Sequence, residues 1–386
     1  MTNSGRIAVV LVLIGFSALC RPMELAAHQQ LFPAPEGARM PAIAVDPDSR
    51  TWAIAWQQGR DIRLATSRDG YSFSAPKALF SGKAGGQSSM PSVAVGRAGE
   101  VSVVWADLSA KNPGVLFTRS VEGGKSFLRP RNIASKIDLP LDPKVAVDRQ
   151  GRIFVVWSGV SDGARDIFLA RSTDGGNSFS SPKNLSDNKH ASELPAIAID
   201  AKDRAYVVWR DKEPPTIQIW FRHSIDGGES FSKPKVVSRT GFSNTPAIAA
   251  EEDGHVYVSW VSNVAGNLDI YFIHSADAGR SFGRLLNISG TRLSSHSPSV
   301  ATDGGGNVVS VWVDATPGKP EIFFRYSSDH GETFYGKKRL SSDSPSAGGP
   351  SVAAIPGKGV FVVWEDAGQN GIRFVDQEEI RAAPTE

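Results

Sequence analysis

The segment KVAVDRQGRIFVVWSGVSDGARDIFLARSTDGGNSF, residues 144–179, contains the pattern on which the chain is built. Its apolar runs are short and rich in Val, Ile and Phe, which favours β-strands. Gly and Asp separate these runs, as they do in the tight turns that join antiparallel strands. The segment therefore predicts three consecutive strands followed by a turn of sequence STDGGNSF (172–179).

This pattern recurs along the chain. The final turn has six copies at intervals of 51 to 53 residues, which start at Ser67, Ser120, Ser172, Ser224, Ser275 and Ser327. A proline that opens a strand occurs seven times, at Pro41, Pro91, Pro143, Pro195, Pro246, Pro298 and Pro350. A tryptophan that ends the next strand also occurs seven times, at Trp56, Trp105, Trp157, Trp209, Trp260, Trp312 and Trp364. Repeats of this length with about four strands each are typical of propeller blades, and we expect the tryptophans to pack between blades.

The prediction is an all-β fold, a seven-bladed β-propeller of four-stranded antiparallel blades. The seventh unit ends before its fourth strand. The segment QQLFPAPEGARMP (29–41) parallels ALFSGKAGGQSSMP (78–91), which precedes the second unit. We therefore expect the N-terminal strand around Leu31 and Phe32 to close the last blade, so that residues 28–386 form one domain without exposed sheet edges at the closure.

Residues 1–27 are typical of an export signal. Arg6 precedes an apolar run from Ile7 to Leu19, which is short for a membrane span, and cleavage is expected after Cys20 or Ala27. Two interpretations stay open: a signal peptide that is removed, or a lipoprotein signal with the lipid on Cys20. The predicted location is secreted or periplasmic, with lipid anchoring through Cys20 as the alternative.

Composition excludes several classes of protein. The chain has 386 residues, one cysteine and a formal net charge of +2. A single cysteine excludes a disulfide framework, and the balanced charge gives no electrostatic surface for nucleic acid. The sequence has no CxxC motif or Cys/His cluster. We therefore expect a monomer with no membrane span, no metal site and no cofactor.

The six turn copies carry a resemblance to a known family. Their pattern, S-x-D-x-G-x-[ST]-[FW], resembles the Asp box, or BNR repeat, of β-propellers in the sialidase-like superfamily. Within each copy the acid is expected to accept backbone N–H bonds across the turn while Gly supplies a positive φ. These acids are assigned a structural role: Asp69, Glu122, Asp174, Asp226, Asp277 and Asp329.

A binding site is expected on the face opposite these turns, where the connections from the second to the third strand and from one blade to the next are longer. Comparison of equivalent positions separates scaffold from candidate site. Five residues near the expected channel mouth break the repeat with charge or a titratable ring: Arg39, Glu193, Arg210, His296 and Glu365. A structural interpretation stays open for each, because Arg210 can pair with Glu193, Arg39 can pair with Glu365, and His296 can be an ordinary loop histidine.

The resemblance implies a glycosidase as one possible function. Sialidases use an arginine triad, a Tyr–Glu nucleophile pair and an Asp acid/base. Arg39 in the sequence A-R-M-P matches the first arginine of their [FY]-R-[IL]-P motif, although the aromatic residue is absent. No tyrosine is expected on the candidate face, and the family's propeller has six blades. The predicted function is therefore an exported module that binds a glycan or an extracellular protein. The alternative is an exo-α-sialidase-like glycoside hydrolase with unassigned catalytic residues.

Overall fold

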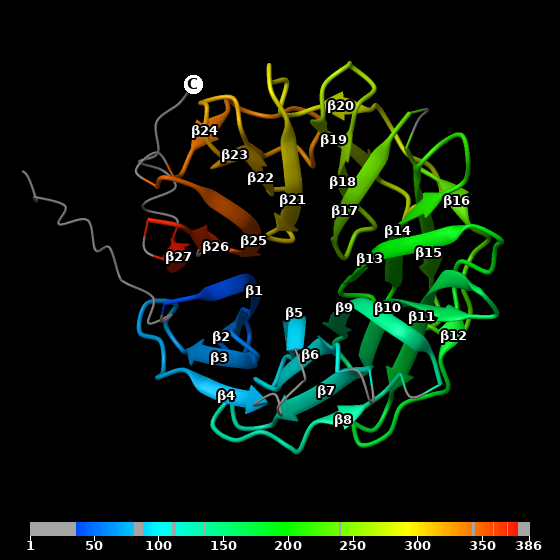
Figure 1. Cartoon of the computed structure of the whole chain (residues 1–386), viewed down its shortest axis with the longest axis vertical. Helices are drawn as coiled ribbons and strands as arrows, with labels where there is room; N and C mark the ends of the chain where they lie inside the picture. Colours follow the sequence, from blue (N-terminus) through cyan, green and yellow to red (C-terminus); the bar gives the residue numbers. More distant parts are fainter. Residues whose placement is uncertain are drawn as a thin grey trace, which may run out of the picture.

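The fold is a ring of seven β-sheets around a central axis (Figure 1). The computed structural model describes residues 36–376, except 81–87, 110–112, 135, 239–240, 342–343, 358 and 369. Within each sheet the strands are antiparallel and follow the order of the chain, with the first strand nearest the axis. The predicted seven-bladed propeller is confirmed.

Each blade is built from an inner, a second, a third and an outer strand. The inner strands are β1 (Ala38–Asp46), β5 (Ser88–Val95), β9 (Asp138–Val147), β13 (Ala191–Ile199), β17 (Ser243–Ala250), β21 (Ser295–Thr302) and β25 (Ala347–Ile355). The second strands are β2 (Thr51–Gln58), β6 (Val101–Asp107), β10 (Ile153–Ser161), β14 (Ala205–Lys212), β18 (Val256–Ser262), β22 (Val308–Asp314) and β26 (Gly359–Asp366).

The third and outer strands complete the blades. The third strands are β3 (Asp61–Ser67), β7 (Gly114–Ser120), β11 (Ala164–Ser172), β15 (Gln218–Ser224), β19 (Asp269–Ser275), β23 (Glu321–Ser327) and β27 (Gly371–Val375). The outer strands are short: β4 (Lys77–Phe80), β8 (Arg131–Asn132), β12 (Lys183–Asn184), β16 (Lys235–Val236), β20 (Leu286–Asn287) and β24 (Lys338–Arg339).

Blade 7 has three strands in the described part of the chain, β25, β26 and β27. The Gly37 N–H donates to the Asn370 carbonyl at 2.7 Å, and the Met40 N–H donates to Glu365 Oε1 at 2.7 Å. These bonds join the start of blade 1 to blade 7. The predicted closing strand around Leu31 and Phe32 and the leader with Cys20 lie outside the described residues. Across the described ranges, no helix is long and apolar enough to cross a membrane.

Tryptophan rings fill the spaces between blades. The seven recurrent tryptophans are at most 1% exposed, which confirms that they belong to the core. Trp52 is also fully buried, and its ring meets that of Phe361 in blade 7 edge to face at 5.8 Å. Burial of such rings contributes about 1.5–3 kcal/mol each. Adjacent blades are therefore held together mainly by apolar contacts.

The six repeated turns between third and outer strands are called the box turns below, numbered by blade. In box turn 3 the Asp174 carboxylate accepts the Ser178 N–H at 2.9 Å and the Ser172 hydroxyl at 2.8 Å. These hydrogen bonds lower the pKa of Asp174 below its ordinary value. Box turns and inner-to-second turns lie on one face of the ring, the box face. The other connections lie on the opposite face, the bulge face.

Candidate functional site

A β-bulge opens every inner strand on the bulge face. In blade 1 the pairing of β1 with β2 shifts between Arg39 and Ala42, and Met40 has a φ of 52°. The same left-handed conformation precedes the proline in all seven blades, at Met40, Met90, Asp142, Leu194, Thr245, Ser297 and Gly349. Only one of these is glycine, although other residues disfavour this region. The bulge is therefore imposed by the fold, and it redirects the neighbouring side chains.

The residue before each left-handed position belongs to what we call the bulge ring. Its members are Arg39, Ser89, Leu141, Glu193, Asn244, His296 and Gly348. The backbone is equivalent at all seven positions, whereas the side chains range from glycine to arginine. The seven positions therefore differ in the chemistry of their side chains and not in the conformation of their backbone.

Three of the five predicted residues line one pocket, and they come from three consecutive blades. Arg39 lies near the start of β1, His296 near the start of β21 and Glu365 near the end of β26. The pocket has a volume of about 310 Å³, and Ser346 and Asn370 are among the other residues in its wall. The structure thus brings blades 6, 7 and 1 together around one concave site.

The charges in this pocket are held in different ways. Glu365 is half-buried, and its bond from the Met40 N–H fixes the carboxylate at the interface of blades 7 and 1. Arg39 is exposed, and the described contacts contain no ion pair between it and Glu365. His296 Nδ1 lies 3.1 Å from Ser297 Oγ. The protein around the mouth of the pocket desolvates His296 and lowers its pKa, so the ring is neutral at pH 7.

Glu193 and Arg210 lie in blade 4 and form a separate ion pair. Lys212 Nζ lies 3.0 Å from the same carboxylate, and Arg210 also donates to Asn244 Oδ1 of blade 5 at 2.7 Å. Partial burial acts to raise the pKa of Glu193, but the hydrogen bonds from Lys212 and Arg210 outweigh it and lower the pKa. The structural interpretation of these two residues is therefore favoured, and they do not line the pocket.

Two further charged residues near the bulge ring were missed by the sequence analysis. Lys144 lies on the inner strand β9, and Asp142 occupies the left-handed position of the same bulge. Desolvation lowers the pKa of Lys144, and the carboxylate of Asp142 opposes that change. The residue after the recurrent proline is Ala or Ser in the other six blades, at Ala42, Ser92, Ala196, Ala247, Ser299 and Ser351. Comparison at this position would have identified Lys144.

The described lining of the pocket offers several groups for binding but no tyrosine. An arginine can donate two parallel bonds to a carboxylate, while Glu365 and a neutral His296 can bond to hydroxyl groups. All six tyrosines are among the described residues, and none lines the pocket: Tyr71, Tyr206, Tyr257, Tyr271, Tyr326 and Tyr335. The arrangement is suited to holding a polar molecule with a negative group.

Comparison with known proteins identifies relatives by structure. No family model and no curated protein matches the sequence. A protein of unknown function from Dyadobacter fermentans is 17% identical with a TM-score of 0.56, over 76% of this chain and 94% of its own. The intramolecular trans-sialidase from Ruminococcus gnavus is 12% identical with a TM-score of 0.51, over 90% and 96%.

An α-L-arabinanase from Penicillium chrysogenum is also similar, with 16% identity and a TM-score of 0.51 over 76% of this chain and 94% of that one. At this level of identity the likeness concerns the fold. The chain has a sialidase-like propeller fold, and a likeness in fold alone does not carry an activity over to it.

Proposed function

We propose that the protein is an exported propeller that binds acidic glycans through the pocket of Arg39, His296 and Glu365. The observation that carries this proposal is the convergence of three blade-specific side chains on one pocket of about 310 Å³. This volume is at the lower end of the range of ligand sites. It suits one or two sugar rings.

Each residue has a role in this proposal. Arg39 binds the carboxylate of an acidic sugar, because its guanidinium is exposed in the pocket. Glu365 accepts hydrogen bonds from sugar hydroxyls, and its bond from the Met40 N–H keeps it oriented before the ligand arrives. His296 contributes a neutral ring nitrogen beside them. Because Glu365 also repels anions, specificity requires a ligand that has both a carboxylate and hydroxyl groups.

Isothermal titration calorimetry with 3′-sialyllactose and lactose tests this proposal. We expect binding of 3′-sialyllactose and binding of lactose that is at least about tenfold weaker, because a charged hydrogen bond contributes about 1.5–3 kcal/mol. Arg39→Ala should lower the affinity for 3′-sialyllactose to that for lactose. Arg292→Ala is the matched control, since this exposed arginine lies on the same face outside the pocket. Equal binding of both sugars by wild type would contradict the proposal.

Hydrolysis of a fluorogenic sialoside separates binding from catalysis. We expect no turnover, because no tyrosine lines the pocket. Turnover by wild type that disappears in Arg39→Ala but persists in Arg292→Ala would instead support a sialidase-like hydrolase. A matched binding screen on immobilised extracellular proteins would detect a protein ligand as the other outcome.

A further inference from the structure

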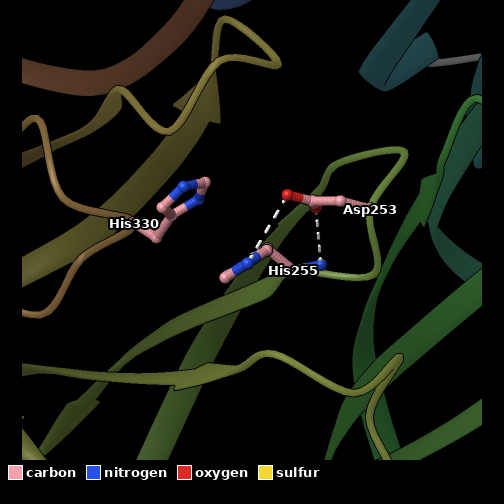
Figure 2. A group of neighbouring side chains, drawn as sticks. All are labelled: Asp253, His255 and His330. Atoms are coloured by element: carbon pink, nitrogen blue, oxygen red, sulfur yellow. Dashed lines mark hydrogen bonds and ion pairs between the residues drawn. The ribbon is translucent and has the colours of Figure 1, made fainter.

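Histidines and acids from two blades meet on the box face, opposite the pocket. Asp253 and His255 lie in the turn between β17 and β18 of blade 5, and His330 lies in box turn 6 after β23 (Figure 2). One potential ligand atom from each residue lies within 4.8 Å of the other two. The His255 and His330 rings stack with their centroids 4.0 Å apart.

Hydrogen bonds orient both rings through their Nδ1 atoms. His255 Nδ1 lies 2.6 Å from His274 Nε2, and His274 Nδ1 in turn lies 3.3 Å from Glu332 Oε1. His330 Nδ1 lies 3.1 Å from the Tyr257 hydroxyl. These contacts leave the Nε2 atoms for a ligand, and His255 Nε2 faces Asp253 Oδ2 at 3.5 Å. Metal-binding histidines are usually oriented in this way, by a partner on the second ring nitrogen.

A buried carboxylate next to His330 gives a second, independent indication that a cation binds here. Glu251 is only 2% exposed. Its Oε1 accepts hydrogen bonds from Thr302 Oγ1 and from the Gly306 N–H, the latter at 3.3 Å. Its Oε2 lies 3.4 Å from His330 Nδ1, and the Tyr257 hydroxyl also interacts with this carboxylate. A buried carboxylate without a permanently charged partner is costly, and a cation bound to the other nitrogen of His330 would offset this charge.

Both histidines break the repeat at positions that face each other. His330 stands where box turns 2, 3 and 4 have Gly123, Gly175 and Gly227. His255 stands where the equivalent turns of blades 3 and 4 have Arg152 and Arg204. The paired change occurs across one interface, between blades 5 and 6, and it places two nitrogen donors there in place of an arginine and a glycine.

We propose that Asp253, His255 and His330 bind a divalent first-row transition metal ion, with zinc as the preferred ion. Two imidazoles and one carboxylate suit zinc, whereas calcium and magnesium prefer oxygen ligands alone. Tetrahedral zinc with bonds of about 2.0–2.1 Å holds its donors about 3.3 Å apart. The donors must therefore approach each other. Asp253 can move because it is exposed, and the two stacked rings, inclined at 23°, must tilt so that both nitrogens point at one ion. The bound ion links blades 5 and 6 and keeps an open coordination position toward solvent.

The test measures zinc on the full chain after chelator treatment, addition of zinc chloride and desalting. We expect about one zinc ion per chain by mass spectrometry of the metal content, and a rise in melting temperature on addition of zinc. Cobalt(II) in place of zinc should give the visible absorption of a site with nitrogen ligands. Wild type that retains no more zinc than His330→Gly would overturn the proposal.

Single substitutions distinguish the proposed metal ligands from the residues that only orient them. His330→Gly and His255→Arg, the residues of other blades, should each weaken zinc binding at least about 100-fold, and His274→Gln about tenfold. Asp253→Asn is an exposed change that leaves the fold intact and should also weaken binding. His223→Gln alters the equivalent histidine of blade 4 and should leave zinc binding unchanged. A similar loss in His223→Gln, or full binding by Asp253→Asn, would contradict the assigned ligands.

Discussion

The interface between blades 3 and 4 and the interface between blades 5 and 6 have the same backbone but different polar side chains. Between blades 3 and 4, the carboxylate of Asp148 is fully buried and pairs with Arg152. Arg171, at the end of β11, bonds to Glu229 and to the Gly227 carbonyl of box turn 4. Arg152 packs so closely over Gly227 that a Cβ atom there would collide with its guanidinium. Ion pairs and hydrogen bonds made by arginines therefore stabilise this interface.

Between blades 5 and 6 the equivalent positions carry histidines. Glu251 replaces Asp148, His255 replaces Arg152 and His274 replaces Arg171, while Glu332 corresponds to Glu229. The shorter imidazole leaves room for a side chain at the position of Gly227, which His330 occupies. The interface between blades 4 and 5 is intermediate, with an Arg204–Asp200 ion pair but with His223 on the third strand.

The two interfaces show that the same backbone can carry side chains of two different chemistries. Arginine is always charged and has no lone pair to offer, so it can only neutralise an acid. Imidazole in its unprotonated form has a lone pair on one ring nitrogen, through which it can bind a cation. Exchange of arginine for histidine thus converts an internal ion pair into a site that needs a partner from solution.

The largest expected effect on stability comes from removal of an arginine at the interface between blades 3 and 4. Arg152→Ala should lower the free energy of unfolding by about 3 kcal/mol, because it leaves the buried Asp148 carboxylate without its counter-ion. His255→Ala, the equivalent change in blade 5, should cost about 1 kcal/mol in a metal-free sample. Denaturant unfolding in the presence of EDTA measures both. Equal losses would show that the two interfaces are held in the same way.

A double exchange should convert the interface of blades 5 and 6 into the arginine type. His255→Arg with His330→Gly should raise the metal-free free energy of unfolding by about 1 kcal/mol, since Arg gives Glu251 a counter-ion and Gly fits the φ of 57° at position 330. The same variant should lose its thermal response to zinc. Each single exchange is the control, and a double variant less stable than both would refute this prediction.

At the interface between blades 4 and 5, His223 should make the stability of the protein depend on pH. Desolvation lowers the pKa of His223, and Lys235, Arg280 and Arg204 act in the same direction against Asp277. Below pH 6.5, His223 therefore binds a proton more readily in the unfolded chain than in the folded protein. Protonation thus favours unfolding, and stability falls as pH decreases. His223→Gln should reduce this loss between pH 7.5 and pH 5.5 by less than about 1 kcal/mol. Denaturant unfolding at the two pH values measures it, and an unchanged slope would contradict the assignment.

The smallest effect is expected in box turn 2. Glu122 accepts a hydrogen bond from Ser126 Oγ at 3.1 Å, whereas the acids of box turns 3 to 6 also accept the backbone N–H of the residue at that position. Glu122→Asp should restore that bond and raise the free energy of unfolding by a few tenths of a kcal/mol. Asp174→Glu is the reverse control. Thermal unfolding should resolve opposite shifts in the two variants.

The fold could be predicted because a repeated unit carries its own strand and turn signals. Box turn 1 is one residue shorter than the other box turns, yet Asp69 still accepts the N–H groups of Tyr71 and Ser72, and these bonds help lower its pKa to about 2. Local backbone bonding thus tolerates the change in length.

The candidate residues could be predicted only in part. Comparison of blades identifies Arg39, His296 and Glu365 but cannot tell that they share a pocket, since this depends on the packing of blades 6, 7 and 1. His255 and His330 were missed because the site was expected on the face opposite the box turns. They are distant in sequence, and only the contact between blades brings them together.

The seven bulges have a consequence for how this protein can change. Their left-handed backbone is kept with Met, Asp, Leu, Thr, Ser or Gly at that position and with seven different residues at the bulge-ring position before it, so the conformation does not depend on one residue type. Substitutions in the bulge ring can therefore accumulate one at a time without loss of the frame. The ring is a platform on which new specificities can be selected, and a library randomised at Arg39, Ser89, Asn244, His296 and Gly348 would make a practical starting point for engineered binders.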